Sequence, residues 1–191
     1  MSDHKLKLVI LDRDGTINLD RDDFVKSPQE WQPLPGSLEA IARLNHAGWH
    51  VAIASNQSGL GRGLFDMAAL NAMHEKLMHS LAAVGGRIDA IFFCPHTPDD
   101  DCNCRKPRPG LFEKIAERFG VTPKGVPAVG DSLRDAIAAS HAGCQPHLVL
   151  TGKSAGMAPE QARQGLPTGT LIHADLAAFA DHLIEHTAPR H

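Results

Sequence analysis

Short apolar runs alternate with segments of helical periodicity along most of the chain. The runs that predict strands lie at residues 7–11, 50–54, 89–93, 126–129 and 147–150. Apolar positions spaced three and four apart predict helices over residues 37–48, 66–84, 109–120 and 133–142. This alternation is typical of βαβ units. We therefore predict an α/β fold with a doubly wound, Rossmann-like parallel sheet, completed by a short strand near Leu171 and a helix over residues 175–185.

Punctuating residues support these boundaries. Ser37 and Asp66 carry side-chain oxygens that can cap the first turns of their helices. Pro109 suits the first turn of the third helix, and Gly120 is the type of residue that ends one. Residues 151–167 are rich in Gly, Pro and Ala, so we expect this segment to cover the surface.

Composition favours one ordinary globular domain. The chain has 191 residues, 42% of them hydrophobic, which suits a single domain over residues 1–191. Its 19 Lys and Arg against 22 Asp and Glu give a formal charge of -3 without a basic run, so we expect no nucleic-acid partner. No apolar run approaches the roughly 18 residues of a membrane span. We expect no membrane partner, a cytoplasmic location and, because no heptad pattern is present, a monomer.

Acidic residues follow two of the predicted strands. Asp12 and Asp14 come directly after the first strand, and Asp131 follows the fourth, with Asp135 beyond it. The carboxyl ends of parallel strands meet at one edge of a sheet, where ligands gather. Like charges this close are costly without a cation, and Mg²⁺ takes carboxylates together with a substrate phosphate. The sequence therefore predicts a magnesium site, with solvated strand-end aspartates as the alternative.

Residues suited to an anion follow the second strand and precede the third helix. Ser55 and Asn56 offer a hydroxyl, an amide and backbone N–H groups. Lys106 brings a cation to the same edge, and Arg105 beside it could contact the substrate beyond its reacting phosphate. We expect these residues to bind a phosphorylated small molecule.

Three of the four cysteines crowd into residues 94–104 together with a histidine. Cys94, His96, Cys102 and Cys104 give four ligands at a spacing that suits a closed tetrahedral zinc site. No place remains for a water ligand, so we expect structural Zn²⁺ that pins this polar loop. Three free thiols beside a chance histidine are the alternative.

Together these motifs resemble the four motifs of the haloacid dehalogenase (HAD) superfamily, in the same order and on the same elements. The residues that carry the resemblance are Asp12-Arg-Asp14-Gly-Thr16, Ser55, Lys106 and Gly130-Asp131-Ser132 with Asp135. The resemblance implies a HAD-like fold in which Ser55 and Lys106 hold the transferring phosphoryl group. Members with Asp at the position of Asp14 transfer phosphoryl groups, so it also implies a phosphatase.

The resemblance assigns further roles to the acids. Asp12 would be the nucleophile that becomes an aspartyl-phosphate, and Asp14 the general acid and then the general base. Mg²⁺ would be held by the Asp12 carboxylate, the backbone carbonyl of Asp14 and Asp131. Asp135 would support this site from behind.

The cysteine loop resembles that of a zinc-bearing subgroup, whose members hydrolyse heptose 1,7-bisphosphate or histidinol phosphate. Residues 12–18, 55–63 and 151–153 favour D-glycero-D-manno-heptose 1,7-bisphosphate, hydrolysed at C7 in heptose biosynthesis. Only five residues separate His96 from Cys102, which resembles the histidinol-phosphate version. Histidinol phosphate and other small sugar phosphates therefore remain alternatives.

No cap domain is expected over the site, because residues 14–37 and 55–106 leave no room for one. Phosphoryl transfer to a sugar acceptor is an alternative that this open site disfavours, since transfer must exclude water. A non-catalytic module that binds phosphorylated ligands is another. We expect surface positions for the scattered histidines His4, His46, His74, His79 and His191.

Overall fold

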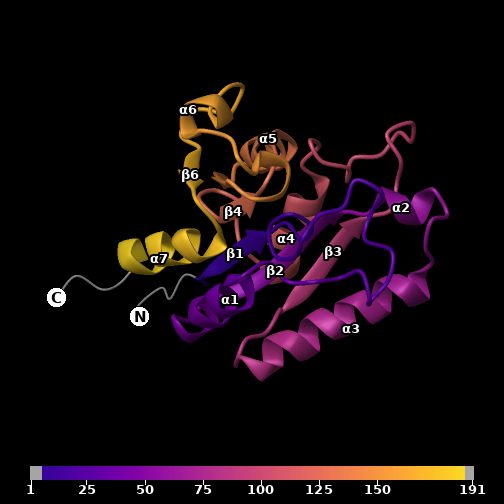
Figure 1. The fold of residues 1–191 in the computed structure, drawn as a ribbon. Helices are drawn as coiled ribbons and strands as arrows, with labels where there is room; N and C mark the ends of the chain where they lie inside the picture. The colour runs from indigo at the N-terminus through magenta and orange to yellow at the C-terminus, as the bar shows by residue number, and fades with distance from the viewer. Residues whose placement is uncertain (1–5, 188–191) are drawn as a thin grey trace.

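The computed structural model describes residues 6–187 and confirms the doubly wound parallel sheet (Figure 1). Its strands are β1 (Leu8–Leu11), β2 (His50–Asn56), β3 (Ala90–Cys94), β4 (Pro127–Gly130), β5 (Gln145–Val149) and β6 (Leu171–His173). They pair in parallel in the order β3-β2-β1-β4-β5-β6. The order reverses between β1 and β4, so the ends of these strands frame the crevice where sheets of this kind bind ligands.

Helices cover both faces of the sheet. They are α1 (Ser37–His46), α2 (Ser58–Gly61), α3 (Met67–Ala83), α4 (Gly110–Phe119), α5 (Leu133–Ala142), α6 (Pro159–Ala162) and α7 (Leu176–Thr187), with a 3₁₀ helix η1 (Gly152–Ser154). Helices α1, α3 and α7 pack on one face, and α4 and α5 on the other (Figure 1). Within residues 6–187, none of the helices is both long and apolar enough to cross a membrane.

The central strand β1 explains why its sequence is an unbroken apolar run. Val9 and Leu11 belong to the core beneath α1, α3 and α7. Leu8 and Ile10 belong to the core beneath α4 and α5. Because helices cover both faces, every residue of this strand is buried, and the alternation of a half-exposed strand is missing.

Two of the predicted helix boundaries are confirmed and one is wrong. Asp66 caps α3, because its carboxylate accepts a hydrogen bond from the backbone N–H of Ala69 at 2.8 Å. Gly120 ends α4 with a φ of 63°. Ser37 does not cap α1: the preceding residue is the cap, and the Ser37 hydroxyl donates to the Ile17 carbonyl at 2.6 Å. This serine instead ties the loop after β1 to the helix.

The segment after β5 also differs from the expectation of a surface cover. The hydroxyl of Thr151 donates to the backbone carbonyl of Gly15 at 2.6 Å, and the hydroxyl of Ser154 donates to that of Asp131 at the same distance. Ser154 is buried. Residues 151–154 are therefore anchored among the strand ends, and only the part that follows them lies outside.

Candidate active site

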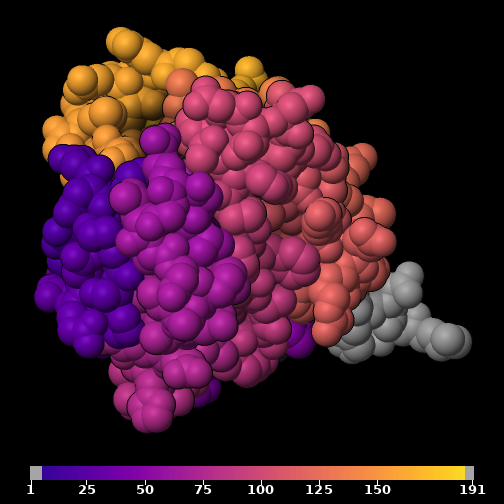
Figure 2. Space-filling model, turned by 90° about the vertical axis from the view of Figure 1, so that its right-hand side faces the viewer, coloured from indigo at the N-terminus to yellow at the C-terminus, as the bar shows by residue number. Residues whose placement is uncertain are grey.

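A cavity of about 250 Å³ opens where the loops that follow β1 to β5 meet. In Figure 2 this edge of the sheet faces the viewer, with segments from widely separated parts of the chain side by side. Among the charged residues that line the cavity are the five that the sequence singled out: Asp12, Asp14, Asp131, Asp135 and Lys106. The structure thus brings together the acids that the sequence placed after separate strands.

Lys106 lies at the centre of this site and is almost entirely buried, with 3% of its surface exposed. Its Nζ atom is 2.9 Å from Asp12 Oδ1 and 2.7 Å from Asp135 Oδ1, and it also donates to the carbonyl of Ala54 at 2.8 Å. Burial alone would lower the pKa of Lys106, but Asp12 and Asp135 outweigh burial and raise that pKa. The lysine is therefore a fixed positive charge.

The carboxylate oxygens of Asp12, Asp131 and Asp135 can all approach within 4.8 Å of one another. Burial, then repulsion from Asp135, raises the pKa of Asp12 to about 6. Burial, then repulsion from Asp12, raises the pKa of Asp131 to about 9. Asp135 has the opposite shift: burial opposes ionisation, but its contacts with Lys106 and Ser132 prevail and lower its pKa. Burial and repulsion from neighbouring carboxylates therefore disfavour the charged forms of both Asp12 and Asp131.

The loop after β5 fixes Asp131. The backbone N–H of Lys153 donates to Asp131 Oδ2 at 2.7 Å. A Cβ atom at Gly152 would lie 2.0 Å from that oxygen, and one at Gly15 would lie 2.1 Å from it. Only glycine at both positions lets the two loops close around the carboxylate. Sequence reasoning used Thr151-Gly-Lys153 only as part of a resemblance and missed its contact with Asp131.

Asp14 is held by hydrogen bonds to both of its carboxylate oxygens. Arg13, which is fully buried, forms a two-pronged pair with it at 2.9 and 3.0 Å. Asn18 Nδ2 donates to Oδ1, and Gln57 Nε2 donates to Oδ2, each at 2.9 Å. Sequence reasoning missed Arg13, Asn18 and Gln57.

Ser55 and Asn56 occupy the predicted place at the end of β2, with different surroundings. Asn56 lines the cavity, and its amide holds the backbone of Lys106 from both sides: Nδ2 donates to the carbonyl at 3.1 Å and Oδ1 accepts from the N–H at 3.0 Å. Ser55 is buried just behind the cavity wall and receives a hydrogen bond from Gln57 Nε2 at 2.7 Å.

The cysteine loop gathers its four candidate ligands. Ligand atoms of Cys94, His96, Cys102 and Cys104 all lie within 4.8 Å of one another. Sγ of Cys94 is 3.0 Å from Sγ of Cys104 and 3.8 Å from that of Cys102, and His96 Nδ1 is 3.2 Å from Cys104 Sγ. Four sulfur and imidazole ligands that converge in this way form a site that could hold a tetrahedral metal ion.

Charged residues form the mouth of the cavity. Arg62, Arg105 and Arg134 line it, and within residues 6–187 none of them has a carboxylate within 4.0 Å. Lys153 Nζ lies 3.0 Å from Asp20, in the loop after β1. The mouth therefore presents unpaired positive charge to a ligand.

One of the scattered histidines is closer to this site than expected. His46 and His79 are exposed, as predicted. His74 is half-buried instead, with Nε2 3.4 Å from Arg13 Nη1, so its prediction was wrong. Burial, then Arg13, lowers the pKa of His74 to about 4. His4 and His191 lie outside the described residues.

The fold and the site define a class of proteins with a doubly wound parallel sheet and a cluster of carboxylates at the carboxyl ends of its strands. The chain belongs to the haloacid dehalogenase-like hydrolases, and the model of that family matches residues 18–143. Ser55, Lys106 and Asp131 fall within the matched segment. This match confirms the superfamily that the motifs resembled.

Individual relatives extend over nearly the whole chain. The D-glycero-beta-D-manno-heptose-1,7-bisphosphate 7-phosphatase of Bordetella bronchiseptica is 59% identical over 94% of this chain and 99% of its own. The phosphatase of the same name from Pseudomonas aeruginosa is 52% identical over 93% of this chain and 98% of its own. A crystal structure of the Bordetella bronchiseptica D,D-heptose 1,7-bisphosphate phosphatase, complexed with magnesium and phosphate, has a TM-score of 0.90 at 58% identity and covers 95% of this chain and 99% of its own.

Proposed function

We propose that this chain is a phosphatase that forms an aspartyl-phosphate at Asp12 and releases the C7 phosphate of D-glycero-β-D-manno-heptose 1,7-bisphosphate. One observation carries the chemistry: the Asp12 carboxylate lies in the cavity, 2.9 Å from the buried Lys106 ammonium. A carboxylate at this position can attack phosphorus, and a fixed cation beside it offsets the charge of the phosphoryl oxygens.

The reaction has two displacements. A carboxylate oxygen of Asp12 first forms a bond to phosphorus, and the bond from phosphorus to the sugar oxygen breaks. The electron pair stays on that oxygen, which takes a proton from Asp14. Water then attacks the same phosphorus and gives a proton to Asp14. The bond to Asp12 breaks, so inorganic phosphate leaves and the carboxylate is restored.

The residues present fit Mg²⁺. Ligand oxygens of Asp12 and Asp131 lie close together, and burial followed by repulsion from neighbouring carboxylates raises the pKa of both groups, as expected of carboxylates that a cation would stabilise. We assign these two carboxylates and the backbone carbonyl of Asp14 as ligands, with Asp135 in support through Lys106. When bound, the ion would supply positive charge to the phosphoryl oxygens. Oxygen ligands of this kind suit magnesium better than a softer metal.

The cysteine loop fits Zn²⁺ in the same sense. Three thiols and one imidazole are soft or borderline ligands, and a set of four leaves no position for reacting water. We assign the ion a structural role. Arg105 and Lys106 follow Cys104 directly, so an ordered metal loop would fix the backbone position of the phosphate-binding lysine.

Two observations support the bisphosphate substrate. The full-length relatives carry that activity in their names. The mouth of the cavity carries Arg62, Arg105 and Arg134, which have no carboxylate partner within the described part of the chain, and this suits a second phosphate distant from the reacting one. Asn56 and Arg105 would contact the substrate near this mouth. The Ser55 hydroxyl would donate a hydrogen bond to the reacting phosphoryl group.

A panel of esters tests the substrate. Phosphate release is measured from heptose 1,7-bisphosphate, fructose 1,6-bisphosphate and histidinol phosphate, with Mg²⁺ present. We expect the heptose ester to have the highest kcat/KM. Faster release from histidinol phosphate would overturn the assignment of the substrate and leave the phosphatase chemistry intact.

A substitution tests the chemistry. Asp12→Asn removes the nucleophile and keeps the shape of the side chain, so we expect activity to fall by at least about 10³-fold on every ester, with the circular dichroism spectrum unchanged. Residual activity close to that of the wild type would overturn the assigned nucleophile. Phosphate appearing on an added sugar instead of water would indicate a phosphotransferase.

A further inference from the structure

Gln57 joins two parts of the site that come from different strands. It follows β2 directly, lines the cavity and is only 4% exposed. Its backbone N–H donates to the carbonyl of Cys94 at 2.7 Å, which anchors it to the end of β3. Its side chain reaches Asp14 after β1 and Ser55 at the end of β2.

The direction of the Gln57 amide follows from its neighbours. Arg13 Nη2 lies 3.2 Å from one end of the amide, and a guanidinium can only donate, so that end is the Oε1 atom. The Nε2 atom then donates to Asp14 Oδ2 at 2.9 Å and to Ser55 Oγ at 2.7 Å. Both amide protons are used, and a flipped amide would place two donors against each other.

This arrangement has a consequence for each partner. The hydrogen bond from Gln57 to Oδ2 restricts rotation of the Asp14 carboxylate, which Arg13 already holds at both oxygens. Ser55 Oγ already accepts a hydrogen bond from Gln57, so the hydroxyl proton of Ser55 points elsewhere. Within residues 6–187 that hydroxyl donates to no protein atom, so its proton remains available to another acceptor.

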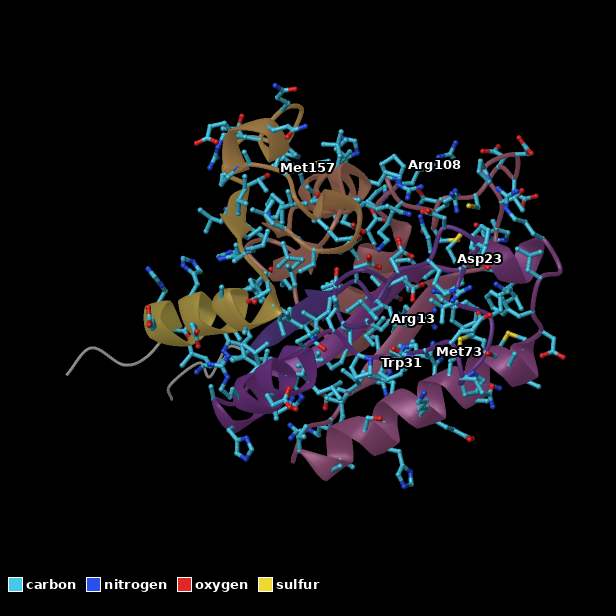
Figure 3. The ribbon with its side chains drawn as sticks, viewed as in Figure 1. Arg13, Asp23, Trp31, Met73, Arg108 and Met157 are labelled. Carbon is cyan, nitrogen blue, oxygen red and sulfur yellow. The ribbon has the colours of Figure 1, made fainter. Side chains whose placement is uncertain are left out.

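We propose that Gln57 is a positioning residue: its amide orients Asp14 for proton transfer to the leaving oxygen and keeps the Ser55 hydroxyl available as a donor. The proposal rests on the proposed phosphatase function and deepens it. Figure 3 shows the support behind it, where Arg13 lies between the sheet and α3 near Trp31 and Met73. Arg13 is buried there and contacts His74, so the group that directs the amide is itself fixed.

The test uses the leaving group. Gln57→Met keeps the length of the side chain and removes the amide. A sugar alkoxide needs a proton to depart, whereas p-nitrophenolate does not, and kcat/KM reports the steps up to this departure. We expect Gln57→Met to lower kcat/KM by about 100-fold on the sugar phosphate that the panel identifies as fastest, and by no more than about tenfold on p-nitrophenyl phosphate. An equal loss on both esters would overturn the assignment.

Two comparisons separate positioning from folding. Gln57→Glu keeps the shape and the contact with Arg13 but cannot donate, so it should show the same selective loss as Gln57→Met. Gln145→Met is the matched control. Gln145 is the first residue of β5, at the end of the strand opposite to the site, and its amide donates to the Gly169 carbonyl. This variant should retain wild-type rates on both esters.

A double substitution tests whether Gln57 acts through Asp14. In an Asp14→Asn background, Gln57→Met should lower the residual rate on the sugar phosphate by less than about threefold. Full additivity of the two losses would overturn the proposal while leaving the phosphatase function standing. A wild-type protein that releases no phosphate from either ester would overturn both.

Discussion

At the scale of single residues, Gly152 is the position where the loop after β5 comes nearest to the carboxylates. A Cβ atom there would lie 2.0 Å from Asp131 Oδ2 and 2.6 Å from the Cα atom of Gly15. We expect Gly152→Ala to displace Asp131 and to weaken Mg²⁺ binding by about 10- to 100-fold, as for changes beside metal ligands. The measurement is a Mg²⁺ titration of phosphate release.

Gly156 provides the matched control. It also has a positive φ, of 78°, but a Cβ atom there would meet nothing within 4 Å. Gly156→Ala should cost about 1 kcal/mol of folding free energy and keep the wild-type Mg²⁺ requirement. If both alanine variants needed the same Mg²⁺ concentration, steric contact with Asp131 would not be the cause.

Lys106 is the other residue whose replacement should be severe. Lys106→Met leaves Asp12 and Asp135 without the cation that lies 2.9 and 2.7 Å from them. We expect kcat to fall by at least about 100-fold, because the charge of the transferring phosphoryl group loses its fixed counter-charge. Steady-state kinetics with p-nitrophenyl phosphate checks this. Lys124→Met, at an exposed lysine, should leave kcat unchanged.

At the scale of elements, the cysteine loop should depend on its metal. Cys102→Ser removes one of four ligands, so we expect loss of bound zinc and a lower unfolding temperature. Activity should fall as well, because Lys106 is only two residues after Cys104 and would lose its fixed position when the loop loses its metal. Elemental analysis and thermal unfolding measure the two effects.

The control for the loop is Cys144→Ala. Cys144 is a buried free cysteine in the core beneath α4 and α5, and it is not one of the four residues whose ligand atoms converge. This variant should lose some stability but keep a full equivalent of zinc. Zinc retained by Cys102→Ser and lost by Cys144→Ala would contradict the assigned ligand set.

Elements were predictable from the sequence where their signal is local. The apolar run of β1 and the capping carboxylate of Asp66 each lie within a few positions of what they determine. The contacts that complete the site do not: Gln57 meets Arg13 across 44 positions, and Arg13 meets His74 across 61. Periodicity carries no information about such pairs. The motifs could indicate which loops converge. The direction of the Gln57 amide and the close approach of Gly152 to Asp131 depend on the three-dimensional structure.

At the scale of the whole molecule, a histidine cluster joins the last helix to the sheet. His147 of β5 is buried, and its Nδ1 lies 3.0 Å from Nε2 of His173 on β6. The ring of His182 on α7 lies 5.1 Å from that of His173, centroid to centroid. Burial, then His173 and His182, lowers the pKa of His147 to about 3. Burial, then His182, lowers that of His173 to about 4.

This cluster should make folding stability depend on pH. In the unfolded chain these histidines titrate near pH 6.5. Above that pH they are neutral in both states and add no pH dependence. Below it the unfolded chain binds protons that the folded chain excludes, so the free energy of unfolding decreases as pH falls from about 6.5 towards 4. The decrease is at most about 1.4 kcal/mol per pH unit for each histidine.

Asp12 and Asp131 at the active site change the free energy of unfolding in the opposite direction, so the experiment must separate their contribution from that of the histidines. Asp12 and Asp131 have raised pKa values, so without Mg²⁺ the folded chain takes up protons there, and this stabilises it as pH falls. Urea unfolding of the wild type and of His147→Phe at pH 7.5 and 5.0 removes this common contribution by difference. We expect the variant to lose less stability than the wild type between these pH values, and His79→Phe, at an exposed histidine, to lose as much as the wild type. Equal losses in all three proteins would mean that His147 is protonated in the folded state at pH 5.0, and that the cluster does not control the attachment of α7.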